Sequence, residues 1–178
     1  MKRVYGLLIG CAMVMAVGVA AAEEGHHPPA VAGSPAFERI KALAGQWGGT
    51  SQMGSEAATP TVVGYKVTSG GSAVVETLSP GTDHEMVSVY HDRNGKLMMT
   101  HYCMLGNQPE LQLTDADDQH LTLSLAGTQG IGSAQEAHMH ALSLAWSGPD
   151  QLTQTWTSYA DGQPKDTAVF KLSRVKSH

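Results

Sequence analysis

From residue 46 onward, hydrophobic and polar residues alternate in short runs that are separated by turn-forming residues. In the run 119–126, for example, three leucines alternate with polar residues, which is the pattern of a strand with one buried face. About ten such runs follow one another, and no helical segment between them is long enough to connect parallel strands. The predicted strands are 46–53, 59–68, 71–78, 85–92, 96–104, 109–115, 119–126, 136–146, 151–159 and 164–174.

A sheet of this many antiparallel strands exposes two unpaired edges unless it closes on itself. We therefore predict an all-β fold, an antiparallel up-and-down barrel of about ten strands. A short amphipathic helix is expected before it, over 35–44, because Pro35 suits a first helical turn, apolar residues recur at helical spacing, and Gly45 ends the pattern. Residues 35–178 then form a single barrel domain.

One turn predicts the register of a central hairpin. The pair Asn94-Gly95 lies between the runs 85–92 and 96–104 and fits a type I turn that ends in a left-handed glycine with a bulge. This register predicts two pairs of neighbours and one further residue on the same inward face: Val87 with His101, Val89 with Met99, and His91.

The N-terminal segment 1–22 has the features of a secretory signal peptide. Two basic residues precede an apolar run, and three alanines come before Glu23. The run is shorter than a membrane span of about 20 residues. Cys11 ends a sequence like a lipoprotein cleavage box, but a lipid there would leave a second apolar stretch behind it. We expect unlipidated export to the periplasm or the medium, with 23–34 as a flexible leader.

Composition narrows the range of partners. Without the signal segment, 9 basic residues face 16 acidic ones, giving a net charge of −7, and no basic block is present. A nucleic-acid partner is therefore not expected, and neither is a transmembrane segment in the mature chain. Cys103 would be the only cysteine left, so no intramolecular disulfide can form. The composition does not indicate an oligomeric state.

The sequence His101-Tyr102-Cys103 is the main candidate for chemistry. Residues two apart in a strand share a face, so His101 and Cys103 project together, and His138 and His140 repeat this spacing on another strand. The apolar residues around both pairs predict that they point inward. The expected ligand-binding residues are His101, Tyr102, Gln108, His138, His140 and Trp156.

Two functions remain open at this point. The first is a non-catalytic barrel that binds a small, largely apolar ligand in its lumen. The second is a metal or haem protein, including an enzyme, in which His101, Cys103, His138 and His140 hold zinc or copper, or one of His138 and His140 binds haem iron. The many methionines suit either a copper surface or a flexible core. We favour the first function, and no motif defines a catalytic residue.

Two short patterns resemble known families. Gly45-Gln46-Trp47 after a short helix resembles the lipocalin and wider calycin pattern, although this chain has no disulfide. The resemblance implies that Trp47 closes one barrel end and that Arg174, on the last strand, stacks on it. The block Thr100 to Pro109 also resembles a family of exported bacterial proteins of unknown function, which implies a shared fold and site but no activity.

The signal segment gives the first testable prediction. The mature protein should begin at Glu23 and carry no lipid, because the small residues before it suit signal peptidase. Intact-mass measurement of the exported protein checks both points. A diacylated Cys11 at the N-terminus would refute the prediction.

Overall fold

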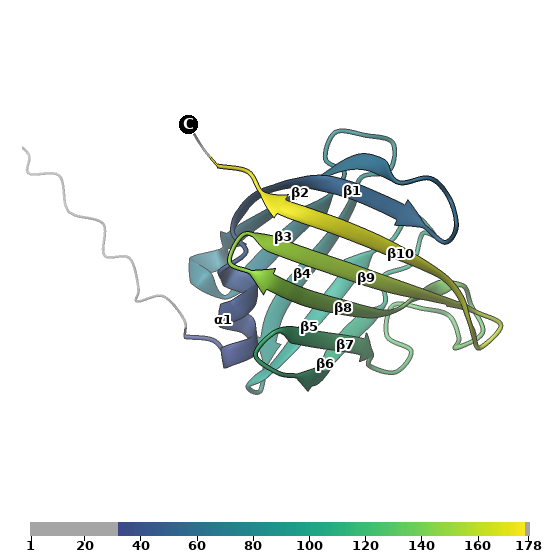
Figure 1. The fold of residues 1–178 in the computed structure, drawn as a ribbon. Coiled ribbons are helices and arrows are strands. Elements are labelled where there is room, and N and C mark those ends of the chain that lie inside the picture. The colour runs from purple at the N-terminus through teal and green to yellow at the C-terminus, as the bar shows by residue number, and fades with distance from the viewer. Residues whose placement is uncertain (1–31, 177–178) are drawn as a thin grey trace, which may run out of the picture.

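The computed structural model describes residues 32–176 and is a closed barrel of ten antiparallel strands with one short α-helix (Figure 1). Each strand pairs with the next in the chain, and the last pairs with the first, so the predicted fold class is confirmed. The predicted signal segment and most of the leader lie outside the described residues. The elements are α1 (Pro35–Lys41), β1 (Gly45–Met53), β2 (Thr59–Thr68), the 3-10 turn η1 (Ser69–Gly71), β3 (Ala73–Leu78), β4 (Met86–Arg93), β5 (Lys96–Tyr102), β6 (Glu110–Ala116), β7 (His120–Leu125), β8 (His138–Gly148), β9 (Gln151–Ala160) and β10 (Gln163–Arg174).

Helix α1 lies at the end of the barrel where β10 finishes, at the left of Figure 1. It begins after Ser34, whose hydroxyl accepts a hydrogen bond from the Phe37 amide at 3.2 Å and donates one to Asp92 at 2.8 Å. Phe37 and Ile40 are buried against the barrel. The helix ends at Lys41, three residues earlier than predicted, because the next residues tighten into 3-10-type turns.

Trp47 closes this end of the barrel. Its side chain has no exposed surface, and its indole N–H donates to the Leu43 carbonyl at 2.8 Å. The Arg174 guanidinium lies over the indole, 4.4 Å from its centre, and donates to the carbonyls of Ala42 and Ala44. The predicted contact between Trp47 and Arg174 is therefore present, and the same arginine fixes the end of α1 to the last strand.

The hairpin of β4 and β5 has a different register from the predicted one. Asn94 and Gly95 both have positive φ, 54° and 76°, as in a two-residue type I′ turn without a bulge. The register moves by one residue, so Ser88 rather than Val87 lies opposite His101. The placement of Val87, Val89 and His91 on the inward face was therefore wrong. The inward side chains of β4 are instead Met86, which packs against the core, and Ser88 and Tyr90, which are fully buried.

The inner faces of the strands supply the core, as the alternation predicts. Most of these side chains are aliphatic or aromatic and have almost no exposed surface. They fill the interior, so the barrel is not an empty tube. The core includes Val63, Tyr65, Val74, Leu78, Leu97, Met99, Leu111, Leu121, Leu123, Leu142, Leu144 and Leu152.

The plug generates a prediction about stability. Trp47→Ala should lower the free energy of unfolding by about 3–5 kcal/mol, because a large buried side chain is lost and a cavity remains. Urea unfolding measures the change. Trp146→Ala is the matched control, since Trp146 is only partly buried beneath Arg39, and it should cost less than half as much. Equal losses, or a Trp47→Ala loss below about 1 kcal/mol, would contradict the role of Trp47 as a plug.

Candidate functional site

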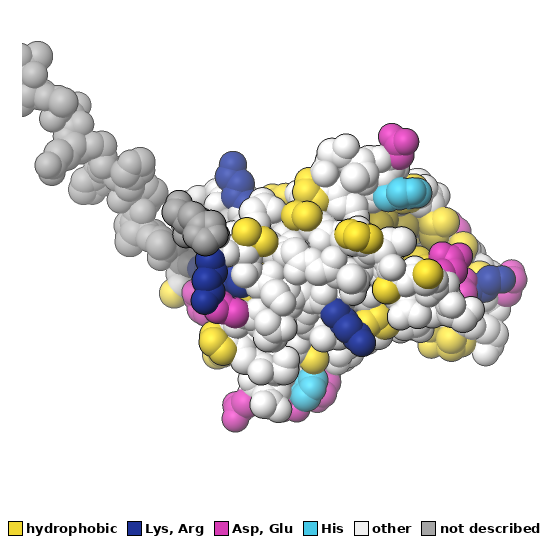
Figure 2. All heavy atoms as spheres, turned by 45° about the horizontal axis from the view of Figure 1, so that its top comes forward, with side chains coloured by type: hydrophobic (Ala, Val, Ile, Leu, Met, Phe, Trp, Pro, Cys, Tyr) yellow, Lys and Arg dark blue, Asp and Glu magenta, His cyan; other side chains and the backbone are white. Residues whose placement is uncertain are grey.

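An apolar cavity of about 270 Å³ lies at the barrel end opposite α1. The location follows from the register, because β1 runs from Trp47 at the closed end to Met53 at the cavity. At the right-hand end of Figure 2, hydrophobic side chains gather among acidic ones. The cavity is lined by Met53, Leu78, Met86, His101, Cys103, Met104, Leu105, Met139, Trp156, Ser158, Asp166, Ala168 and Phe170.

The rim and the wall of the cavity differ in exposure. Met53, Met104 and Leu105 are about half exposed, at 48%, 55% and 55%. Trp156 and His101 are each only 1% exposed, so they form the deep part of the cavity. The cavity thus runs from an apolar rim to a buried aromatic pair. An exposed apolar rim around a hollow is typical of a surface that something covers.

His101 is the predicted site residue that the structure places most clearly in the cavity. It follows Leu97 and Met99 on the inner face of β5, as the alternation predicts. Its ring centre lies 4.6 Å from that of Trp156, and its Nδ1 lies 3.0 Å from the Ser88 hydroxyl. Burial lowers the pKa of His101 to about 4, so the imidazole is neutral near pH 7.

Behind this pair lies a buried network centred on Glu76, which the sequence analysis missed. The carboxylate has no exposed surface and accepts hydrogen bonds from Tyr65 at 2.7 Å, Tyr90 at 2.9 Å and Gln154 at 2.6 Å. Burial raises the pKa of Glu76, and the hydrogen bonds of the two tyrosines and the other donors act in the opposite direction.

The alternation contains a signal for Glu76 that could have been used. In the predicted strand 71–78, Glu76 lies between Val74 and Leu78 at a spacing of two, on a face that is otherwise apolar. An acid on such a face needs buried donors. The pKa values of Tyr65 and Tyr90 are raised well above the ordinary value, first by burial and then by the charge of Glu76. Both hydroxyls therefore remain protonated donors.

Cys103 lines the cavity beside His101, as predicted from their spacing. It is partly buried, and burial raises the pKa of its thiol, which disfavours the reactive thiolate. Tyr102, between them in sequence, is 50% exposed and is not part of the cavity lining. The prediction that Tyr102 contacts a ligand in the lumen is not supported, because adjacent strand residues point to opposite faces.

Gln108 also lies outside the cavity. It is exposed, its side chain donates to the Gly106 carbonyl at 3.1 Å, and its backbone N–H donates to Gly130 at 2.8 Å. Its neighbour Asn107 is buried and connects two loops by hydrogen bonds. The Asn107 amide donates to Glu136 at 2.7 Å and to the Ala137 carbonyl at 2.8 Å, and so joins two loops. This segment shapes the barrel rim and does not contribute a ligand contact to the cavity.

His138 and His140 do not point into the barrel as predicted. The register between β8 and β9 shifts between Met139 and Ala141, and this bulge reverses the alternation around His140. His138 lies opposite Tyr159, and the His140 ring stacks on the same tyrosine at 3.7 Å. Met139 takes the inward position and lines the cavity. Both histidines therefore pack against Tyr159 and neither lines the cavity, although His138 is buried, with 1% of its surface exposed.

The four predicted metal ligands consequently separate into two pairs. His101 and Cys103 line the cavity, whereas His138 bonds to its neighbours, through Nδ1 to the Glu136 carbonyl at 2.6 Å and through Nε2 to His140 at 3.1 Å. Within residues 32–176, no three side chains of His, Cys, Asp or Glu are grouped to hold a metal ion. The predicted convergence of all four ligands was therefore wrong, and the cause is the bulge in β8.

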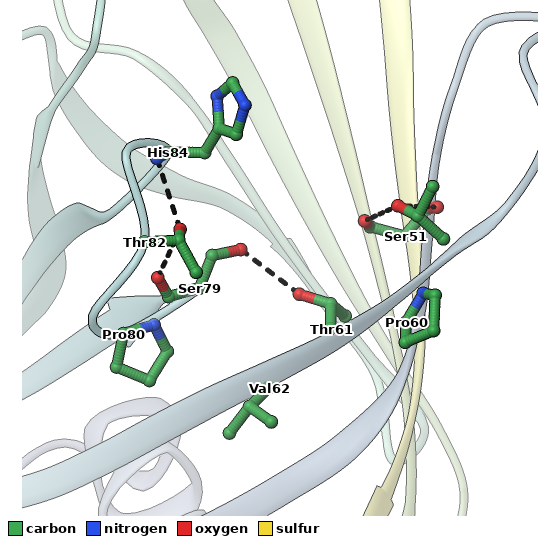
Figure 3. A pocket seen from close by; sticks show the side chains of 9 residues that line it. Ser51, Pro60, Thr61, Val62, Ser79, Pro80, Thr82 and His84 are labelled. Carbon is green, nitrogen blue, oxygen red and sulfur yellow. Dashed lines mark hydrogen bonds between the residues drawn. The ribbon is translucent and has the colours of Figure 1, made fainter.

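A second hollow, of about 400 Å³, is lined by residues of β1, β2 and the loop after β3 (Figure 3). It lies between β2 and the loop after β3, and hydroxyl groups line much of it. These hydroxyls bind one another or the backbone: Thr61 lies 3.2 Å from Ser79, and Thr82 donates to the Ser79 carbonyl at 2.8 Å. Their satisfied hydrogen bonds and open position make this hollow a weaker candidate than the cavity with the buried His101.

The comparisons with known proteins identify a fold and no activity. No protein-family model matches the chain, and no curated protein matches it. Eleven chains of solved structures match. One is a protein of unknown function from the DUF3598 family of Nostoc punctiforme, with a TM-score of 0.55, 14% identity and coverage of 83% of this chain. Another is a redesigned β-barrel, with a TM-score of 0.35, 11% identity and coverage of 77% of this chain and 95% of its own, which is too distant to support an argument.

The similarity to the DUF3598 protein covers only part of that protein. This chain spans about half of the DUF3598 protein, 51% of its length. At 14% identity the similarity shows a shared barrel fold, and the lipocalin resemblance of the sequence stays a resemblance. Separately, none of the helices among the described residues is long and apolar enough to cross a membrane. The function of the chain must therefore be inferred from the cavity itself.

The buried imidazole generates a prediction about pH. The folded pKa of about 4 lies below the ordinary 6.5, so between these pH values the unfolded chain binds more protons. Stability should therefore fall as pH decreases from 6.5 to 4, by roughly 3 kcal/mol from this group. His101→Gln should remove this part of the pH dependence in urea unfolding. The same substitution at the exposed His84 is the control, and an unchanged His101→Gln profile would contradict the prediction.

Proposed function

We propose that this protein binds a small, largely apolar molecule in the cavity between its rim and the His101–Trp156 pair. The observation that carries the proposal is a concave apolar site with only a few polar groups, which is the usual composition of a ligand pocket. The volume of about 270 Å³ suits a compact molecule, since a cavity of about 150 Å³ can hold benzene. A bicyclic aromatic molecule is of a suitable size.

The residues of the rim support the same proposal. Met53, Met104 and Leu105 expose apolar surface that a ligand would remove from water, at about 25 cal/mol for each Å². Methionine side chains are flexible and adapt to ligands of different shape. Met86 and Met139 continue the apolar surface inside the cavity. The binding energy would therefore come mainly from desolvation, with few groups selecting the ligand.

The side chains of the cavity favour binding of a ligand without catalysis. His101 has a neutral hydroxyl rather than a carboxylate as its direct partner. Cys103 has a raised thiol pKa, the opposite of an activated nucleophile. No acid–base pair or activated nucleophile is therefore present among the described residues that line the cavity. Export to the periplasm or the medium is part of the proposal and rests on the predicted signal segment.

Metal binding is the second candidate function, with only two of the four predicted ligands, His101 and Cys103, in the cavity. Four methionines, Cys103 and His101 line one cavity, and thioether, thiolate and imidazole groups together suit Cu(I) better than zinc. A haem would depend on His101, because His138 and His140 lie outside the cavity. Metal analysis and an absorption spectrum of purified protein separate the candidates. Stoichiometric copper or a Soret band would replace the apolar-ligand proposal.

The cavity generates a prediction about binding. The protein should bind 2-methylnaphthalene, and Ala168→Leu should weaken binding at least tenfold, because Ala168 is a small residue of the cavity wall and leucine would fill the space. Tenfold corresponds to about 1.4 kcal/mol. Titration calorimetry measures the affinity, with quenching of Trp156 fluorescence as a second signal.

Ala145→Leu is the matched control for this experiment. Ala145 lies between the inward-facing Leu144 and the partly buried Trp146 on β8, outside the cavity, so the same substitution should leave the affinity unchanged. Thermal unfolding of both variants shows that they are folded. Equal affinities of the two variants would place the binding site elsewhere, and no binding by the wild-type protein would refute the proposal for ligands of this size.

A further inference from the structure

A single acid lines the apolar cavity. Among the described residues of its lining, Asp166 is the only one with a carboxylate, and none is a lysine or an arginine. The other polar lining residues are His101, Cys103 and Ser158. The imidazole of His101 is neutral near pH 7, and burial raises the pKa of the Cys103 thiol, which favours its neutral form. The charge of the cavity is therefore the one negative charge of Asp166.

A β-bulge between β9 and β10 holds this acid at the rim. The register of the two strands shifts between Pro164 and Thr167. Two residues of β10, Lys165 and Asp166, therefore lie opposite the single residue Ser158. The Ser158 hydroxyl accepts from the Asp166 backbone N–H at 3.1 Å and donates to the Asp166 carbonyl at 3.2 Å. Both backbone groups of Asp166 are thus fixed, and its side chain is left for another role.

The Asp166 carboxylate has no partner within residues 32–176. It belongs to none of the ion pairs there, and the hydrogen bonds of the residue are made by its backbone. Lys165, its neighbour in the bulge, is exposed, lies outside the cavity lining and is not paired with it. Other acids of this kind are used by the fold, as in Asp117, which accepts from the His120 amide. Asp166 is therefore free to bind a group from outside the chain.

The deep part of the cavity is aromatic and lies a short distance from this acid. Trp156 is held there, since its indole N–H donates to Gln154 at 3.1 Å and its ring centre lies 4.6 Å from that of His101. In the register of β9 and β10, Trp156 lies opposite Ala168. Asp166 precedes Ala168 by two residues, which is at most about 7 Å along a strand. An aromatic group beside Trp156 would therefore bring a short substituent close to the carboxylate.

We propose that the cavity takes aromatic amines, whose apolar ring fills the space beside Trp156 while a primary ammonium group at the rim donates to the Asp166 carboxylate. This inference rests on the proposed function and names its ligand class. An organic anion would meet the charge of Asp166 and no basic residue of the lining. Because Asp166 is exposed, water and salt screen the ion pair, so it should raise affinity by roughly two- to fivefold. The apolar contacts supply most of the binding energy, and the acid selects the ligand.

Three naphthalene derivatives of similar shape test the selection at pH 7. The cation is 2-naphthylmethylamine, its uncharged counterpart is 2-naphthalenemethanol, and the anion is 2-naphthoate. In titration calorimetry the wild-type protein should bind the amine roughly two- to fivefold more tightly than the alcohol, and the anion more weakly than the alcohol. Added salt should reduce the advantage of the amine, because it screens an exposed ion pair.

Two substitutions of the same kind separate a direct contact from an effect of net charge. Asp166→Asn removes the charge and keeps the size of the side chain, so it should lower the affinity for the amine to that for the alcohol and leave the alcohol unaffected. Asp161→Asn is the matched control. Asp161 is an exposed acid in the turn between β9 and β10, outside the cavity lining, and asparagine tolerates its positive φ of 54°. This variant should keep the preference for the amine. Equal effects of the two substitutions would overturn the inference.

The contact can also be observed directly in the wild-type protein. The ¹³C resonance of the Asp166 carboxyl carbon, assigned by its absence in the Asp166→Asn variant, should shift when the amine is added and stay in place with the alcohol. No shift, or a shift of Asp161 instead, would overturn the inference. An amine that binds no more tightly than the alcohol would do the same, but would leave the proposed function intact. Failure of all three probes and of 2-methylnaphthalene to bind would refute both.

Discussion

The carboxylate of Glu76 lies inside the barrel with no exposed surface, and the surrounding structure is arranged to satisfy it. A buried charge is unfavourable unless hydrogen bonds replace its hydration. Tyr65, Tyr90 and Gln154 provide these bonds from three different strands, so the carboxylate connects β2, β4 and β9 across the interior. The polar core of the barrel is therefore a set of mutually dependent groups. Removing one donor would leave its partners without hydrogen bonds.

The two ends of the barrel differ because of what lies beside this network. At one end, α1, Trp47 and Arg174 pack into a closed plug, with the arginine bonded to the backbone that follows the helix. At the other end the rim is formed by flexible methionines, and the cavity reaches inward to His101 and Trp156. Trp156 belongs to both the network and the cavity. A ligand would therefore contact an aromatic wall that the buried carboxylate holds in place.

The alternation of apolar and polar residues in the sequence was sufficient to predict the strands, the closed barrel and the inward position of His101. It failed where the backbone departs from regular pairing. Asn94 adopts a positive φ, so the hairpin is tighter than a bulged turn and its register moves by one residue. The bulge at His140 reverses the alternation of β8, so Met139 lines the cavity and the two histidines do not. A bulge depends on pairing with the neighbouring strand, and one strand's sequence does not encode it.

These two departures change the chemistry that the sequence suggested. Because the hairpin has no bulge, Ser88 instead of Val87 lies opposite His101, so the imidazole gains a hydroxyl partner. With the bulge present in β8, a methionine replaces the histidines in the cavity wall. A site with four converging ligands would take a metal ion. A single neutral imidazole in an apolar wall instead offers one polar contact to the cavity, which suits a largely apolar molecule.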